Sequence, residues 1–181
     1  AAETVRVAMG IPENDTDTVR AATVDVSDAD SIGQLFGYVA EVFGGLDILV
    51  CNAGGPPPGS FSTVSEDQWE LAYNLTLMSV VRSVKHSVPL MREAEAPAIL
   101  VVGSSSVKRP IPNLLLSNVF RPALNALVTD ISADLAEYGI RINMLCPGRI
   151  HTGRVDRLDQ ARAEREGTTP EKIRKAAIQN I

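Results

Sequence analysis

Polar or small residues follow two short apolar runs of the sequence. Ser104 stands one glycine after the run 98–102, and the triplet Asn52-Ala53-Gly54 follows the run 46–51. A hydroxyl held at the end of a strand can polarise a carbonyl oxygen by donating a hydrogen bond to it. Small residues let a flat ligand approach the backbone. The pattern therefore predicts a carbonyl-polarising group at Ser104 and a ligand-facing turn at 52–54, for which an ordinary tight turn is the alternative.

Asn74 falls inside a segment with helical spacing of its apolar residues. Asparagine is a poor helix former because its amide competes for the backbone hydrogen bonds. The residue therefore indicates a position where the amide is used, and a structural asparagine satisfied within the helix is the alternative.

Metal chemistry is not predicted. The two histidines, His86 and His151, are far apart and have no cysteine or carboxylate partner at the spacing of metal ligands. We expect His86 on a helix surface. The two cysteines, Cys51 and Cys146, lie within or at the end of apolar runs, where a free thiol packs as a small hydrophobe. This cysteine usage favours a reducing, cytoplasmic location.

Composition limits the partners of the chain. The 181 residues are 45% hydrophobic, which is enough for one α/β domain with a sizeable core. The net charge is -5, so no broad basic field is available for nucleic acid or an anionic membrane. No stretch approaches the roughly 20 apolar residues that cross a bilayer. The expected partner is a small-molecule substrate.

Four β-branched, almost continuously apolar runs alternate with helical patterns. Such runs are typical of strands in a parallel sheet covered on both faces. The predicted strands are 18–26, 46–51, 98–102 and 140–145, and the predicted helices are 28–43, 65–91 with a bend or end at Pro89, and 115–137. The order predicts a Rossmann-like, doubly wound parallel sheet in a single domain over 1–181, with ligands at the carboxyl ends of its strands.

The segment after Gly148 changes to charged and polar residues. Helices are predicted at 154–166 and 170–179, the second entered through Thr169-Pro170. We interpret 153–181 as a helical substrate lid within the same domain.

The run 46–54, LDILVCNAG, resembles the LDILVNNAG signature of the short-chain dehydrogenase/reductase family. The resemblance implies that Asn52, Ala53 and Gly54 stabilise the central sheet and lie beside the cofactor ribose. The segment 24–28, VDVSD, is similar to the strand end that contacts adenine in this family, which assigns Asp25 and Val26 to the cofactor site. A helix cap formed by Ser27 or Asp28 is the alternative reading of that segment.

The same resemblance assigns catalytic roles. Asn74 corresponds to an asparagine that holds a water of the proton relay, and Ser104 to the catalytic serine. At the positions of the family's tyrosine and lysine this sequence has Ser117 and Arg121, within LSNVFR. A serine hydroxyl does not usefully ionise near neutral pH, and arginine does not readily shuttle a proton, although Arg121 could hold ribose hydroxyls. The LSNVFR segment resembles an LSNxxR pattern found in an atypical group of reductase-like proteins.

The segment 143–152, NMLCPGRIHT, resembles the family element that lies against the nicotinamide. The resemblance places Pro147, Gly148, Ile150 and Thr152 in the cofactor site, and a plain Pro-Gly turn is the alternative. The family's glycine-rich phosphate-binding turn does not occur in the 181 residues. We therefore expect the sequence to be the middle part of a longer protein.

Three functions follow from the resemblance. The first is an oxidoreductase that uses NAD or NADP and transfers a hydride to or from a carbonyl or alcohol, similar to a 3-oxoacyl reductase. The second is a non-catalytic protein of the same fold that binds a ligand or oligomerises, which the loss of the tyrosine favours. The third is a dehalogenase-like lyase, although dehalogenases keep the tyrosine. A homodimer or homotetramer formed by the helices of Trp69 and Leu124 is implied as well.

Overall fold

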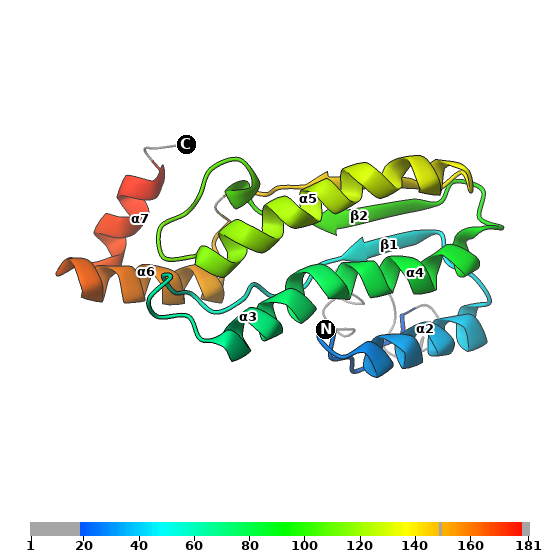
Figure 1. Cartoon of the computed structure of the whole chain (residues 1–181), viewed down its shortest axis with the longest axis horizontal. Helices are drawn as coiled ribbons and strands as arrows, with labels where there is room; N and C mark the ends of the chain where they lie inside the picture. Colours follow the sequence, from blue (N-terminus) through cyan, green and yellow to red (C-terminus); the bar gives the residue numbers. More distant parts are fainter. Residues whose placement is uncertain (1–18, 149, 179–181) are drawn as a thin grey trace. The chain divides into compact units, whose positions relative to one another are not determined.

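A computed structural model describes residues 19–148 and 150–178 (Figure 1). The chain separates into two compact units, Ala1–Leu145 and Cys146–Ile181. The first contains the sheet and its helices, and the second contains two helices. None of the helices in the described ranges is long and apolar enough to span a membrane.

The sheet of the first unit is parallel. Within the described residues it has three strands in the order β1 (Ile48–Cys51), β2 (Ala98–Val102) and β3 (Arg141–Leu145). Val50 pairs with Leu100, which pairs with Asn143, so the three carboxyl ends meet at one edge. The predictions of strands at 46–51, 98–102 and 140–145 and of a Rossmann-like parallel fold are confirmed.

The predicted strand at 18–26 is wrong over the residues that the structure describes. Residues 19–26 contain no strand and end in a turn before helix α2 (Ala29–Phe43). A strand requires a neighbour with which its backbone can pair, and the described sheet provides no ladder for this run. Thr18 lies outside the described residues. Apolar, β-branched composition alone therefore did not determine the local structure here.

The predicted helices are present, with one interruption. Helix α2 (Ala29–Phe43) begins where the Asp28 carboxylate accepts from Ser31 N at 2.7 Å, and ends at Gly44 in the left-handed conformation. The segment predicted as one helix at 65–91 consists of α3 (Glu66–Ala72), the π-helical turn η1 (Tyr73–Met78) and α4 (Ser79–Met91). Pro89 lies inside α4, which ends two residues later rather than at the proline.

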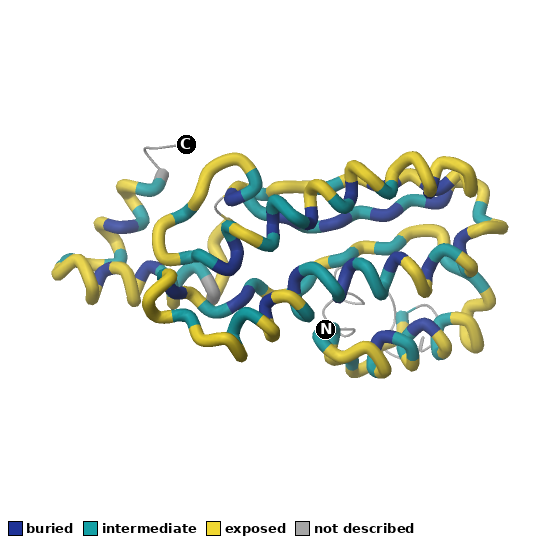
Figure 2. The backbone as a smooth tube through the Cα atoms, viewed as in Figure 1, coloured by how far each residue is buried: buried dark blue, intermediate teal, exposed yellow. Residues whose placement is uncertain are grey.

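Helix α5 (Leu115–Ala136) continues through Pro122. It packs against β3, α4 packs against β1, and α2 packs on α4 (Figure 1). Figure 2 shows the buried residues where these elements face one another. The core between sheet and helices is apolar and includes Val84, Met91, Ile99, Val101, Leu124, Val128 and Ile140.

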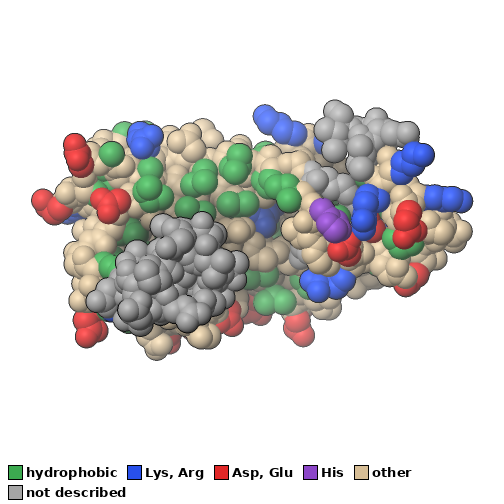
Figure 3. All heavy atoms as spheres, turned by 180° about the vertical axis from the view of Figure 1, so that it is seen from behind, with side chains coloured by type: hydrophobic (Ala, Val, Ile, Leu, Met, Phe, Trp, Pro, Cys, Tyr) green, Lys and Arg blue, Asp and Glu red, His purple; other side chains and the backbone are tan. Residues whose placement is uncertain are grey.

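The other face of the sheet is exposed at β1 and β3 and half-buried at β2. Ile48, Val50 and Leu145 are each more than half exposed, and the alternate residues of the same strands face the helices. Figure 3 shows hydrophobic side chains gathered on the side of the molecule opposite to the view of Figure 1. The helices described here therefore cover only one face.

The two cysteine thiols differ in how far they are buried. Cys51, at the end of β1, is half-buried, and burial raises the pKa of its thiol to about 11. Cys146 is exposed, which corrects the prediction that both would be buried. The residue follows the last residue of β3, where the strand pattern has ended.

The second unit contains α6 (Gly153–Glu166) and α7 (Pro170–Ile178). Helix α6 is capped by Thr152 and ends at Gly167 in the left-handed conformation, and Ala163 and Ile173 are buried. The predicted helices at 154–166 and 170–179 are confirmed over the described residues. Their use as a substrate lid stays a prediction.

Candidate active site

The carboxyl ends of β1 and β2 carry the polar and small residues that the sequence singled out. Asn52 and Gly54 follow β1 and are exposed, and a Cβ added at Gly54 would meet no atom within 4 Å. Gly103 follows β2, and its N–H donates to Leu145 O at 2.7 Å, which joins the ends of β2 and β3. The backbone at Gly54 is therefore open to a ligand at the edge where α/β proteins bind one.

Ser104 is held by Ser106. It is the N-cap of the short 3₁₀ helix η2 (Ser105–Val107), and its Oγ accepts from Ser106 N at 3.2 Å and from Ser106 Oγ at 3.1 Å. Ser106 is only 2% exposed, whereas Ser104 is half-buried. The hydroxyl predicted to polarise a carbonyl is thus fixed by a buried neighbour two residues away.

Ser117 and Arg121 lie one helical turn apart on α5 and both are buried, at 8% and 7% exposure. Ser117 Oγ lies 3.4 Å from Ser106 Oγ. Arg121 Nη1 donates to Val102 O at 2.8 Å, the last carbonyl of β2. The structure therefore brings Ser104, Ser117 and Arg121 together around the end of β2.

Asn74 lies in the π-helical turn η1, and both ends of its amide are occupied. Its Oδ1 accepts from Arg82 Nη2 at 2.9 Å, and its Nδ2 donates to Glu70 O at 3.2 Å. Its backbone carbonyl accepts from Ser79 N across the wide turn. The side chain is therefore satisfied within the structure, which favours the structural alternative for the amide. A π-helical turn is frequent at functional sites, and the sequence had not indicated one.

Thr76, in the same π-helical turn, was not singled out from the sequence. It is 1% exposed, and among the described residues its Oγ1 has no hydrogen-bond partner. A buried hydroxyl without a partner is uncommon, because leaving it unsatisfied costs about 1–3 kcal/mol. Its apolar neighbours in the helical pattern gave no signal of an unsatisfied polar group.

The turn before α2 is a hydrogen-bonded unit. Asp25 Oδ1 accepts from Ser27 N at 2.9 Å and from Ser27 Oγ at 2.6 Å, and these hydrogen bonds lower the pKa of the Asp25 carboxyl. Asp28 caps the helix, as the alternative reading of this segment expects. Val26, beside Asp25, is half-buried. Contact of Asp25 or Val26 with adenine stays a prediction.

Arg82 of α4 joins this turn to Asn74. Its Nη1 donates to Ser27 O at 3.0 Å while its Nη2 donates to Asn74 Oδ1. The contact with Ser27 spans 55 residues of sequence. Arg82 was missed by sequence reasoning, because its charge is not distinguished in the sequence from that of Lys85 in the same helix.

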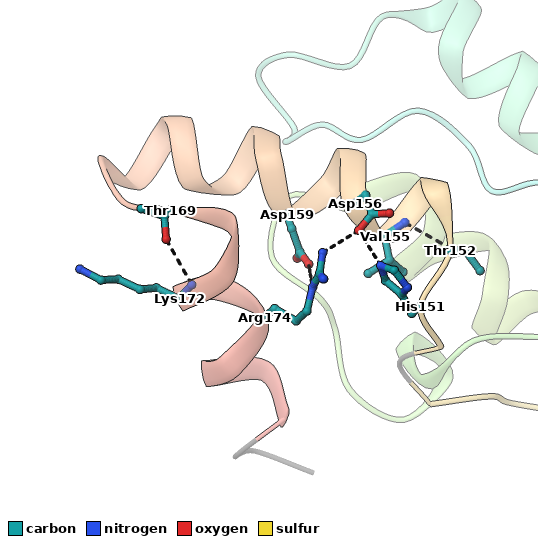
Figure 4. Close-up of polar contacts among 8 residues, drawn as sticks. All are labelled: His151, Thr152, Val155, Asp156, Asp159, Thr169, Lys172 and Arg174. Atoms are coloured by element: carbon teal, nitrogen blue, oxygen red, sulfur yellow. Dashed lines mark hydrogen bonds and ion pairs between the residues drawn. The ribbon is translucent and has the colours of Figure 1, made fainter.

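The residues predicted to meet the nicotinamide begin the second unit. Pro147 and Gly148 lie in irregular backbone after β3, Ile150 is exposed, and Thr152 Oγ1 accepts from Val155 N at 3.4 Å to cap α6. His151 Nε2 lies 2.9 Å from Asp156 Oδ1, which also accepts from Arg174 Nη2 at 2.6 Å (Figure 4). Helix capping therefore accounts for the Thr152 hydroxyl, and cofactor contact by these residues stays a prediction.

A cavity of about 300 Å³ lies between two loops of the first unit. Phe61 lines it from one loop, Pro110 and Ile111 line it from the other, and Leu115 lines it from the start of α5. Asn118 fixes the second loop, because its amide donates to Ile111 O and accepts from Ile111 N, both at 2.9 Å. The cavity is open and mostly apolar, and Asn118 follows Ser117 directly in α5.

In the described residues, no group of histidine, cysteine and carboxylate side chains could hold a metal ion.

Comparisons with known proteins identify the family of the chain. The model of the family described as enoyl-(acyl carrier protein) reductase matches residues 4–179. Dehydrogenase/reductase SDR family member 4 of Sus scrofa is 32% identical over 150 residues, which is 81% of this chain and 54% of that protein. An uncharacterized NAD-dependent oxidoreductase of Mycobacterium tuberculosis is 32% identical over 139 residues, 76% of this chain and 50% of that one.

The solved structures agree in fold. L-sorbose reductase from Gluconobacter frateurii, complexed with NADPH and L-sorbose, superposes with a TM-score of 0.83 at 24% identity, over 95% of this chain and 63% of that one. Sorbitol-6-phosphate 2-dehydrogenase from Erwinia amylovora gives a TM-score of 0.88 at 24% identity, over 99% of this chain and 69% of that one. The chain belongs to the short-chain dehydrogenase/reductase family. It spans about half the length of the curated relatives that it matches.

Proposed function

We propose that the protein is an oxidoreductase that transfers a hydride between NAD or NADP and a carbonyl or alcohol of a small molecule. The observation that carries the proposal is the Ser104 hydroxyl, fixed at the carboxyl end of the central strand β2 by two hydrogen bonds from Ser106. A preorganised donor at this edge stabilises the negative charge that develops on a carbonyl oxygen during hydride addition.

The residues of the first unit fit a nicotinamide dinucleotide in their chemistry. The open backbone at Gly54 admits a flat group, the exposed Asn52 offers an amide, and Arg121 is a permanent cation at the end of β2. When bound, the cofactor would supply or accept the hydride. Asn52, Ala53, Gly54 and Arg121 would hold its ribose side, and Asp25 and Val26 its adenine. Pro147, Gly148, Ile150 and Thr152 are proposed for the nicotinamide.

The substrate is proposed to carry an apolar group next to its carbonyl. The cavity lined by Phe61, Pro110 and Ile111 supports this, since apolar surface selects apolar ligands and the cavity adjoins the turn of α5 that carries Ser117. A non-catalytic protein of the same fold is the second candidate. It is favoured by Ser117, because a buried serine cannot replace a tyrosine as the acid.

Titration with cofactor separates these two functions. We expect calorimetry of the full-length protein to give micromolar dissociation constants for NAD(H) or NADP(H), and the tighter of the two identifies the cofactor. Reduction of ethyl acetoacetate and a panel of small ketones, followed at 340 nm, then tests hydride transfer. If neither cofactor binds at millimolar concentration, the oxidoreductase proposal is wrong and the non-catalytic one stands.

We propose a homo-oligomer formed through an aromatic cluster on α3, η1 and α5. The Phe120 ring lies 5.8 Å from Trp69 and 6.2 Å from Tyr73, and the exposed Leu71 and Val119 lie on the same elements. Aromatic side chains with exposed apolar neighbours are typical of interfaces. Light scattering is expected to give a dimer or tetramer, and Phe120→Asp is expected to give a monomer. The control Val42→Asp, on α2, should leave the mass unchanged, and a monomeric parent protein would contradict the proposal.

A further inference from the structure

Ser106 is not among the residues proposed above to contact the substrate or the cofactor. Its side chain, however, contacts both Ser104 and Ser117. Its Oγ lies 3.1 Å from Ser104 Oγ, 3.4 Å from Ser117 Oγ and 3.5 Å from Ser117 O. All three serines lie in the first unit, at the end of β2 and the start of α5. Ser106, the member between the other two, is the most deeply buried.

The lengths of these contacts suggest a direction for the hydrogen bonds. Ser106 has one hydroxyl proton, and it donates that proton to Ser104 Oγ at 3.1 Å rather than to Ser117 O at 3.5 Å, because hydrogen bonds weaken with length. The contact between Ser106 and Ser117 must then use the Ser117 proton. The hydroxyls therefore form a chain in which Ser117 donates to Ser106 and Ser106 donates to Ser104.

This direction determines which group the hydroxyl proton of Ser104 can reach. Ser104 Oγ accepts from both the N–H and the O–H of Ser106, which uses both of its lone pairs. Its own proton is then left to donate to a group other than Ser106. Hydrogen bonds in a chain polarise one another, so Ser104 becomes a stronger donor than an isolated serine.

We propose that Ser106 is a positioning residue that directs the Ser104 proton toward the substrate oxygen, and that Ser117 contributes to the site as the first donor of this chain. The inference rests on the proposed oxidoreductase function. It gives Ser117 a role that does not require ionisation, in place of the acid that a tyrosine would provide.

Ser106→Ala tests the role of this residue. We expect kcat for reduction of ethyl acetoacetate, or of the best ketone of the panel, to fall about tenfold, the value of one hydrogen bond of about 1.4 kcal/mol, with KM changed less than twofold. Ser106→Thr keeps the hydroxyl and should recover most of the rate. Ser105→Ala is the matched control, since Ser105 is the exposed neighbour in the same 3₁₀ turn.

A second measurement does not depend on activity. Melting temperatures of Ser104→Ala, Ser106→Ala and the double variant form a cycle, and the double variant is expected to lose less than the sum of the two single losses because the two hydroxyls share one hydrogen bond. Additive losses would overturn the chain. Coupled losses with an unchanged kcat in Ser106→Ala would overturn the positioning role. A parent protein that binds no cofactor and reduces no ketone would overturn the proposed function, and the catalytic role of Ser106 with it.

Discussion

Replacing Ser104 with alanine is expected to lower kcat for carbonyl reduction by roughly 100- to 1000-fold, the usual effect of removing one donor to a developing oxyanion. The dissociation constant of the cofactor should stay within a factor of two, because the hydroxyl is proposed to donate to the substrate carbonyl and not to the cofactor. Steady-state kinetics and calorimetry on the same preparation measure the two quantities.

The size of this effect distinguishes Ser104 from Ser106. Ser104 is proposed to contact the reacting oxygen, whereas Ser106 acts through Ser104, so the loss in Ser104→Ala should exceed the loss in Ser106→Ala by tenfold or more. Ser104→Thr retains a hydroxyl as the conservative comparison, and its melting temperature shows whether the added methyl is tolerated at the half-buried site. A rate for Ser104→Ala equal to that of the parent protein would remove the residue from the mechanism.

Most of the fold was predictable because its strands are short and apolar and its helices begin and end at capping residues. Asp28, Ser65 and Gly44 mark helix ends in both the sequence and the structure. The run 18–26 shows the limit of this reasoning. Apolar composition makes a strand possible, but pairing with a neighbour makes it a strand, and pairing partners cannot be read from the run itself.

The π-helical turn at Tyr73–Met78 was hidden for a related reason. The apolar residues of 65–91 fit a continuous helix, and widening one turn shifts their phase too little to be seen in the pattern. Asn74 was noticed as a poor helix former, but the cause lies in its two hydrogen-bond partners, which are four and eight residues away. Only the structure shows that Arg82 and Glu70 use both ends of its amide.

Ser104, Ser117 and Arg121 were singled out from the family register, and the structure places all three near the end of β2. Ser106 could not be distinguished from Ser105 by sequence, because adjacent serines look alike until one is buried and the other exposed. The roles proposed for these residues stay predictions that the kinetic experiments test. The arrangement of the second unit's residues around the cofactor stays a prediction in the same sense.

Replacing Arg82 with alanine is expected to lower the free energy of unfolding by about 2 kcal/mol, because it removes two charge-assisted hydrogen bonds from a half-buried side chain. It also leaves Ser27 O and Asn74 Oδ1 without this donor. Urea unfolding measures the loss. Lys85→Ala is the matched control, since Lys85 is an exposed cation on the same helix α4, and it should change stability by less than about 0.5 kcal/mol.

The same variant tests whether the turn before α2 belongs to the cofactor site. Arg82 fixes Ser27, and Ser27 in turn holds the Asp25 carboxylate, so loss of Arg82 should loosen the proposed adenine-binding turn and weaken cofactor affinity several-fold. Arg82→Lys keeps the charge but lacks the planar guanidinium that reaches two acceptors at once. Its cofactor affinity should therefore lie between that of the parent protein and that of Arg82→Ala. An Arg82→Ala protein that is less stable but binds the cofactor as tightly as the parent would place Asp25 and Val26 outside the cofactor site and leave Arg82 a purely structural residue.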